Sequence, residues 1–97
     1  MAYGIVHFFP GGTKDQYEAA LASVHPDDGQ SLPPGQVYHF AGPSEGGWLI
    51  VAVHESQASW ESFRDSTLLP TLQSGVEGSF QGPPQEQSFE IDHLQTA

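Results

Sequence analysis

Residues 46–72 read GGWLIVAVHESQASWESFRDSTLLPTL, and this stretch decides the fold because it predicts a buried strand that turns directly into a helix. Six consecutive apolar residues, Trp48 to Val53, are typical of a strand that is covered on both faces. Ser56 is expected to cap the helix, because its hydroxyl can accept a hydrogen bond from an unpaired amide one turn on. Trp60 and Phe63 fall on one side of this helix. Pro70 is expected to end or kink it, since the proline ring clashes with the preceding turn.

The remainder of the chain predicts three more strands and one more helix. Strands are expected at residues 2–9, 36–41 and 87–94, where β-branched and aromatic residues are concentrated. Thr13 and Gln16 predict a capping box at the start of the first helix. Pro26 should end that helix, because it disfavours the helical conformation of His25. The intervening loops are predicted at residues 27–35, 42–47 and 73–84.

The order of elements is βαββαβ, the split βαβ pattern of ferredoxin-like α+β domains. We expect one domain over residues 1–97, with a four-stranded antiparallel sheet in the order 4-1-3-2 and both helices on one face. The two central strands, residues 2–9 and 48–54, are apolar in both phases. Because no segment remains to cover the second face, a second copy of the chain is the expected cover, and we predict a homodimer.

Composition narrows the classes of partner. Lys14 and Arg64 are the only basic side chains against twelve carboxylates, and the formal charge is −10. Nucleic acids and anionic membrane surfaces are therefore not expected as partners, because a polyanion would be repelled. The chain has no cysteine, which excludes disulfides and thiolate metal sites. No leader or membrane-spanning segment is recognisable, so we expect a cytoplasmic protein.

Several features together resemble the dimeric α/β-barrel superfamily. They are Gly47-Trp48 before an apolar strand, the corner Val53-His54-Glu55-Ser56, an aromatic helix ending in Leu68-Leu69-Pro70, and a short last strand. Within this superfamily the chain is most similar to small antibiotic-biosynthesis-monooxygenase-like proteins. The resemblance implies a homodimer with a pocket between sheet and helices in each subunit. Members include cofactor-free oxygenases of aromatic polyketides, haem-degrading enzymes, polyketide cyclases and proteins without known activity.

The chain departs from the superfamily in one respect. Its oxygenase and haem-degrading branches resemble one another in using an asparagine near a pocket tryptophan. Trp60 could supply the tryptophan, but the chain contains no asparagine. Either the chemistry differs, or another group such as Gln57 or a histidine takes the place of the asparagine.

Histidines are the main chemical candidates, because imidazole can take or give a proton near pH 7. His39 ranks first because it lies inside a short strand, although the adjacent Tyr38 points to the opposite face and cannot pair with it. His54 ranks second, at a strand-to-helix corner where Glu55 could orient it, and His7 ranks third. The alternative for each is a strand-end residue that bonds to backbone or water.

No metal site and no cofactor are predicted. His7 is expected at the opposite end of the sheet from His54 and His93, and those two should be separated by a whole strand, roughly 10 Å. Such an arrangement does not bring three histidines to one metal ion. The carboxylates are scattered and lack the paired setting of acid–base catalysts.

Tyr17, Trp60 and Phe63 are candidate substrate-binding residues. They can wall a flat apolar pocket for a small aromatic molecule, or simply pack the helices on the sheet. Two hypotheses follow. One is a cofactor-free enzyme in which His39 or His54 removes a proton and the substrate carbanion reacts with oxygen or cyclises. The other is a non-catalytic dimer with a ligand-binding or structural role. A cavity containing a histidine favours the first, and a solidly packed interface favours the second.

Overall fold

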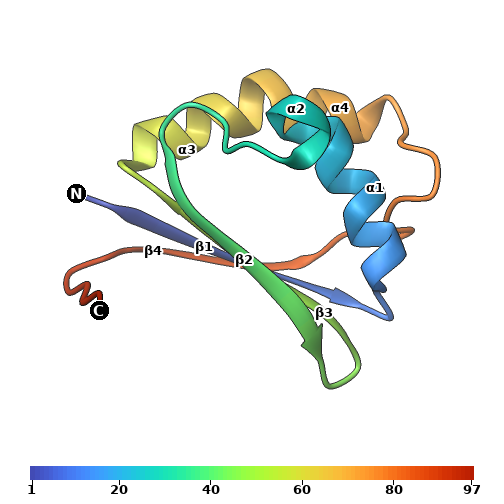
Figure 1. Cartoon of the computed structure of the whole chain (residues 1–97), viewed down its shortest axis with the longest axis horizontal. Coiled ribbons are helices and arrows are strands. Elements are labelled where there is room, and N and C mark those ends of the chain that lie inside the picture. The colour runs from blue at the N-terminus through green and yellow to red at the C-terminus, as the bar shows by residue number, and fades with distance from the viewer.

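The computed structural model describes residues 1–97, and its elements follow the predicted order. The strands are β1 (Tyr3–Pro10), β2 (Gln36–Ser44), β3 (Gly47–His54) and β4 (Gln85–Glu90). The helices are α1 (Lys14–Val24), the short α2 (Pro26–Gly29), α3 (Gln57–Phe63), the π-helical η1 (Arg64–Leu68) and α4 (Leu69–Gln73). Figure 1 shows all helices on one side of the sheet.

The sheet is antiparallel throughout, and its order is β2-β3-β1-β4. This is the predicted order 4-1-3-2 of a ferredoxin-like α+β fold, so the fold prediction is confirmed. The apolar strands β1 and β3 occupy the centre, and β2 and β4 form the two edges.

The sheet register decides which side chains face the helices. Residues that lie opposite each other in an antiparallel pair point to the same face, and side chains alternate along each strand. Tyr3 lies opposite His54, and His39 lies opposite Ala52, two residues from His54. His7 shares the phase of Tyr3. All three candidate histidines of the sheet therefore lie on the helix-covered face.

The predicted placement of His7 at the far end of the sheet from His54 is wrong. His7 is opposite Ile50, in the middle of β1, because this strand continues as far as Pro10. The Trp60 ring reaches both histidines, with its centroid 5.9 Å from the ring of His7 and 5.7 Å from that of His54.

Both predicted helix starts are confirmed, whereas Pro70 does not end its helix. Thr13 and Gln16 form the capping box of α1, and Ser56 caps α3 by accepting a hydrogen bond from the Ser59 amide. The helical segment then continues through Pro70 to the end of α4. Directly before this proline, η1 adopts the wider π turn, which makes room for a ring that would clash in a regular helix.

Two strand boundaries differ from the prediction. β2 extends to Ser44 instead of residue 41, because β2 is an edge strand that tolerates Pro43. The loop that follows is the two-residue turn Glu45-Gly46. β4 covers residues 85–90 instead of 87–94, because it pairs with β1 and its ladder ends opposite Tyr3, where β1 begins.

The core between sheet and helices is small. Ile5, Trp60 and Phe63 form its buried cluster, with exposed fractions of 1%, 4% and 8%. The opposite face of the sheet carries Tyr38, Phe40 and Phe89, and all three are exposed. No helix of the structure has the length and apolar character needed to cross a membrane.

We expect Ile5→Ala to lower the free energy of unfolding by about 2–5 kcal/mol, because the substitution leaves a cavity beside Trp60 and Phe63. Urea denaturation at one fixed protein concentration measures the change. Leu94→Ala, at an exposed residue, is the control and should change stability by less than about 0.5 kcal/mol. Equal losses in both variants would contradict this assignment of the core. Should Ile5→Ala fail to fold, Ile5→Val should cost about 0.5–1.5 kcal/mol.

Candidate functional site

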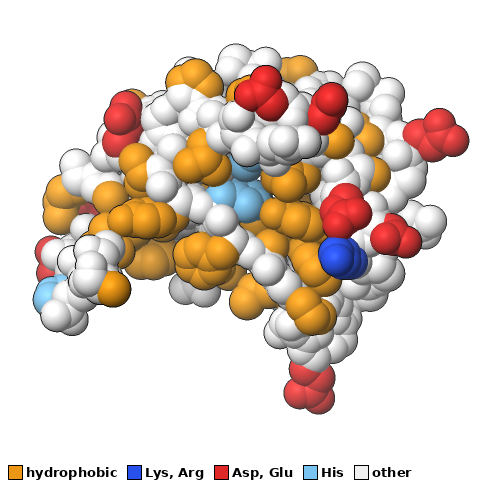
Figure 2. Space-filling view, viewed as in Figure 1, with side chains coloured by type: hydrophobic (Ala, Val, Ile, Leu, Met, Phe, Trp, Pro, Cys, Tyr) orange, Lys and Arg blue, Asp and Glu red, His pale blue; other side chains and the backbone are white.

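A cavity of about 730 Å³ lies between the helix-covered face of the sheet and the helices. Most of its lining is hydrophobic, and it includes Trp60, Phe63 and Tyr17 together with His7 and His39. In Figure 2, pale blue histidine atoms are visible in an opening that is framed by orange hydrophobic side chains. The interface between sheet and helices is thus hollow and contains histidines.

The loop that follows α4 forms one wall of the cavity. Phe80 of this loop stacks on Phe9 of β1, with ring centroids 3.7 Å apart and an interplanar angle of 9°. The Tyr17 ring of α1 also lines the cavity and lies 5.3 Å, centroid to centroid, from the ring of Trp48, which is opposite Phe9 in the sheet. Aromatic rings in its lining give the hollow the character of a binding site for a flat apolar molecule.

A chain of four hydrogen bonds runs along the helix-covered face of the sheet. The Tyr17 hydroxyl lies 2.7 Å from Nε2 of His39, whose Nδ1 lies 2.9 Å from Oε1 of Gln36. Nε2 of Gln36 lies 3.1 Å from Nε2 of His54, whose Nδ1 lies 2.9 Å from the Ser59 hydroxyl. The chain therefore joins α1, β2, β3 and α3.

The amide of Gln36 determines which ring nitrogen of each histidine carries the proton. Its oxygen can only accept, so His39 donates from Nδ1; its nitrogen can only donate, so His54 accepts at Nε2. With both rings neutral, the Tyr17 hydroxyl donates to His39, and Nδ1 of His54 donates to Ser59. All members of the chain are then satisfied without a buried charge.

Burial favours the neutral form of these rings. The pKa of His39 is lowered to about 4, first by burial and then by the positive charge that His25 can carry. His25 lies close by, with its ring centroid 4.6 Å from that of His39. Burial lowers the pKa values of His25 and His54 as well, and raises the pKa of Tyr17. At neutral pH, His39 is an unprotonated base next to a protonated phenol.

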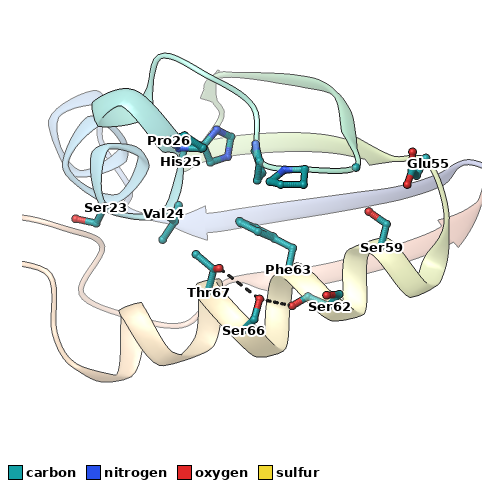
Figure 3. A pocket seen from close by; sticks show the side chains of 13 residues that line it. Ser23, Val24, His25, Pro26, Glu55, Ser59, Ser62, Phe63, Ser66 and Thr67 are labelled. Atoms are coloured by element: carbon teal, nitrogen blue, oxygen red, sulfur yellow. Dashed lines mark hydrogen bonds between the residues drawn. The ribbon is translucent and has the colours of Figure 1, made fainter.

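A second hollow of about 560 Å³ is polar, and Figure 3 shows it. Val24, His25 and Phe63 line both hollows and so form the wall between them. Ser59 lies in this polar cleft, together with other hydroxyl side chains of α3 and η1. The hydrogen-bond chain that begins at Tyr17 in the apolar cavity therefore ends in the polar cleft.

His7 occupies a different part of the cavity. Its Nε2 lies 2.6 Å from Oε1 of Glu86 on β4, and its ring packs against Trp60. The structure thus brings His39, Tyr17 and His54 into one chain, whereas His7 pairs separately with a carboxylate. Trp60 and Phe63 contact the ring of His54 from α3.

Sequence reasoning missed several members of the site. Gln36 was read only as the first residue of a strand, and no local pattern marks a glutamine that joins two histidines. Phe80 lies in a Gly/Ser/Pro loop that carried no signal apart from its aromatic ring. Gln57, considered as a replacement for asparagine, bonds to Glu61 and does not line the cavity. The structure holds no group of three or more histidines or acidic residues placed to bind a metal ion.

The last hydrogen bond of this chain, between His54 and Ser59, depends on a glycine. Gly35 has a φ of +83°, and a Cβ at this position would overlap the Ser59 hydroxyl. Only glycine meets both conditions, which gives Ser59 room to accept the hydrogen bond from His54.

The sheet order and the one-sided helical layer define an α+β protein of the ferredoxin-like type. No family model and no curated protein matches the chain. Among solved structures, it is similar to Rv0793 from Mycobacterium tuberculosis, with a TM-score of 0.71 at 12% identity, over 99% of this chain and 100% of that one.

Two further solved structures are similar over nearly the whole chain. A candidate antibiotic biosynthesis monooxygenase from Chloroflexus aurantiacus J-10-fl has a TM-score of 0.66 at 11% identity, over 99% of this chain and 98% of that one. A mutant of SnoaB, a cofactor-independent oxygenase from Streptomyces nogalater, has a TM-score of 0.59 at 14% identity, over 98% and 94%. The chain therefore has the fold of antibiotic-biosynthesis-monooxygenase-like proteins, and the resemblance drawn from sequence is confirmed at the level of fold.

We expect the protein to lose stability as the pH falls from about 6.5 toward 4. In this window the unfolded chain binds a proton at His39 and the folded chain does not, so protons favour unfolding. His25 and His54 act in the same direction. Between pH 7 and about pH 5, the urea midpoint should fall less in His39→Gln than in the wild type. His93→Gln, in the exposed C-terminal tail, is the control, and identical pH dependence in all three proteins would contradict the assignment.

Proposed function

We propose that the protein is a small cofactor-independent enzyme that binds a planar aromatic or polyketide-type molecule and removes a proton from it, in monooxygenase-like chemistry. The observation that carries the proposal is the 2.7 Å hydrogen bond between the Tyr17 hydroxyl and Nε2 of His39 in the wall of an apolar cavity. The fold shared with SnoaB, a cofactor-independent oxygenase, supports it. A hollow interface that contains histidines favours an enzyme over a solidly packed structural dimer.

The proton passes through Tyr17. A substrate proton moves to the phenolic oxygen while the Tyr17 proton moves to Nε2 of His39, which leaves a substrate anion and an imidazolium. His39 is a weak base in the empty cavity because burial disfavours its charged form. A substrate anion beside it favours the imidazolium, so His39 becomes a stronger base as the substrate loses its proton. Gln36 also favours the imidazolium, since its oxygen accepts the hydrogen bond from Nδ1.

The substrate anion then reacts with dioxygen as the second substrate. Its carbanion carbon adds to dioxygen to form a peroxide, and the imidazolium returns the proton to the peroxide oxygen. Loss of water leaves a carbonyl, so one oxygen atom enters the product and the other leaves in water. A cyclase would use the same anion to attack a carbonyl of the substrate itself, without consuming oxygen. Oxygen consumption separates these two reactions.

The remaining candidate residues have supporting roles in this proposal. Tyr17, Trp60 and Phe63 contact the substrate as cavity walls, with Tyr17 also in the proton path. His54 acts through Gln36 and holds the far end of the chain. His7, paired with Glu86 in the cavity wall, provides a polar contact for a substituent of the substrate.

We also propose that the protein works as a homodimer, with the uncovered sheet faces packed together. Tyr38, Phe40 and Phe89 are 42%, 58% and 49% exposed on that face. Neighbouring apolar residues of β1 and β3 extend the surface, and no segment of the chain covers it. A second copy presents the same surface and buries both.

Tyr17→Phe and His39→Phe should each reduce proton removal by about 10²-fold or more, because each breaks the proton path. An anthrone, a planar aromatic with an acidic CH₂ group, is a suitable probe. Its conversion is followed by absorbance and by an oxygen electrode. Tyr3→Phe is the matched control, because the Tyr3 hydroxyl bonds to Ser88 and Tyr3 does not line the cavity. Equal rates in Tyr17→Phe and Tyr3→Phe would contradict the proposed path.

Phe40→Glu should convert the dimer to a monomer in analytical ultracentrifugation at micromolar concentration, because it places a charge in the proposed apolar interface. Leu94→Glu introduces the same charge at an exposed residue of the C-terminal tail and should leave the dimer intact. A wild-type protein that sediments as a monomer would refute the homodimer.

A further inference from the structure

Gln36 holds a position that neither sequence nor similarity assigns. It is 6% exposed, and its carboxamide lies between two imidazole rings, bonded to each. A buried carboxamide has one end that only accepts and one that only donates. With its oxygen toward His39 and its nitrogen toward His54, the Gln36 carboxamide imposes one direction on the hydrogen-bond chain. Each member donates to the next one, from Tyr17 to Ser59.

The direction of the chain determines what Tyr17 offers to the cavity. Its only hydroxyl proton is committed to His39, which has no proton of its own on Nε2. The phenolic oxygen has no second partner within the protein, so its remaining lone pair is free to accept. The cavity thus meets Tyr17 as a hydrogen-bond acceptor and not as a donor.

We propose that Gln36 is a positioning residue that sets the direction of this chain and thereby makes the cavity selective for ligands that donate a hydrogen bond, namely the hydroxyl form of a planar phenol or enol. The ligand part of this inference rests on the proposed function of the cavity. The direction of the hydrogen-bond chain does not depend on that function, and it can be tested in the protein without a ligand.

The selectivity follows from the cost of an unpaired acceptor. A phenol or enol donates to the Tyr17 oxygen, whereas a ketone or quinone brings a second acceptor to the same place and leaves both oxygens unpaired in an apolar hollow. Leaving one acceptor without a hydrogen bond lowers the affinity of the ligand by at least about tenfold. Because the proposed oxidation adds a carbonyl, a further acceptor, at the reacting carbon, the same preference helps the product to leave.

Gln36→Glu should reverse the direction of hydrogen-bond donation between His39 and Tyr17. A carboxylate accepts from both rings, so His54 must present a proton at Nε2, and His39 is favoured as the imidazolium. His39 then donates from Nε2 to Tyr17, whose hydroxyl is free to donate into the cavity. The other titratable groups around the two rings are His25, 4.6 Å from His39 by ring centroid, and Glu55, which adjoins His54 in the sequence. Neither His25 nor Glu55 is substituted in this variant.

The first test uses the free protein. Long-range nitrogen–proton NMR spectra distinguish protonated from bare ring nitrogens. In the wild type, His39 and His54 should both carry the proton on Nδ1, with bare Nε2. In Gln36→Glu, Nε2 of both rings should be protonated. Gln95→Glu makes the same change in the exposed C-terminal tail and should leave both rings as in the wild type. A wild-type His39 with its proton on Nε2 alone would overturn the assignment.

The second test measures binding of three flat probes by tryptophan fluorescence: naphthol, its methyl ether and naphthoquinone. The wild type and Gln95→Glu should bind naphthol at least about tenfold more tightly than the other two. Gln36→Glu should prefer naphthoquinone. If Gln36→Glu does not fold, Gln36→Met removes both bonds, and its preference for naphthol should fall toward equality.

The outcomes separate the two proposals. Equal wild-type affinities for naphthol and its ether, or an unchanged preference in the folded Gln36 variant, would overturn the role of Gln36 in selectivity. A wild type that binds none of the probes would overturn the cavity as a ligand site, and with it the selectivity. The NMR spectra would then still decide the direction of the chain.

Discussion

Every side chain of the candidate site depends on the register between β1 and β3, the two central strands. A shift of either strand by one residue would turn its own histidine, His7 on β1 or His54 on β3, to the uncovered face, because side chains alternate along a strand. Both strands are apolar in both phases, so hydrophobicity alone does not select this register. A contact that only glycine permits contributes to the selection, because a Cβ at Gly47, which lies opposite Pro10, would overlap the Phe9 carbonyl.

The buried polar groups impose the second constraint. Placing two imidazoles, an amide and a phenol beside an apolar cavity is costly unless each finds a partner. Gln36 solves this problem because one carboxamide supplies the acceptor that His39 needs and the donor that His54 needs. The result is a polar network without charge, in which the histidines stay neutral and available. The same network ties α1 and α3 to the sheet through Tyr17 and Ser59.

The two faces of the sheet therefore differ in character. The helix-covered face is hollow and carries the polar chain, whereas the opposite face is apolar and exposed. The formal charge of −10 comes mainly from carboxylates outside the cavity lining, where Glu86 is the only acidic member and is paired with His7.

The sequence by itself determined the order of the elements, the sheet order, the caps at Thr13 and Ser56, and the exposed apolar face. These follow from local signals, namely apolar runs, capping residues and short connections, and such signals act within a few residues. It also singled out His39 and Tyr17 as separate candidates. It misplaced His7 along the sheet, and it expected Pro70 to end or kink the helix, whereas a π turn before Pro70 lets the helical segment continue.

Only the tertiary structure decided that Tyr17 and His39 form a pair, that Gln36 joins His39 to His54, and that Phe80 lines the cavity. Tyr17 and His39 are 22 residues apart, and they meet only when α1 packs against β2. Gln36 and His54 are 18 residues apart, and they meet only when β3 pairs with β2. The physical reason is that hydrogen bonds between distant residues depend on strand register and helix docking. No spacing within the chain records either of these.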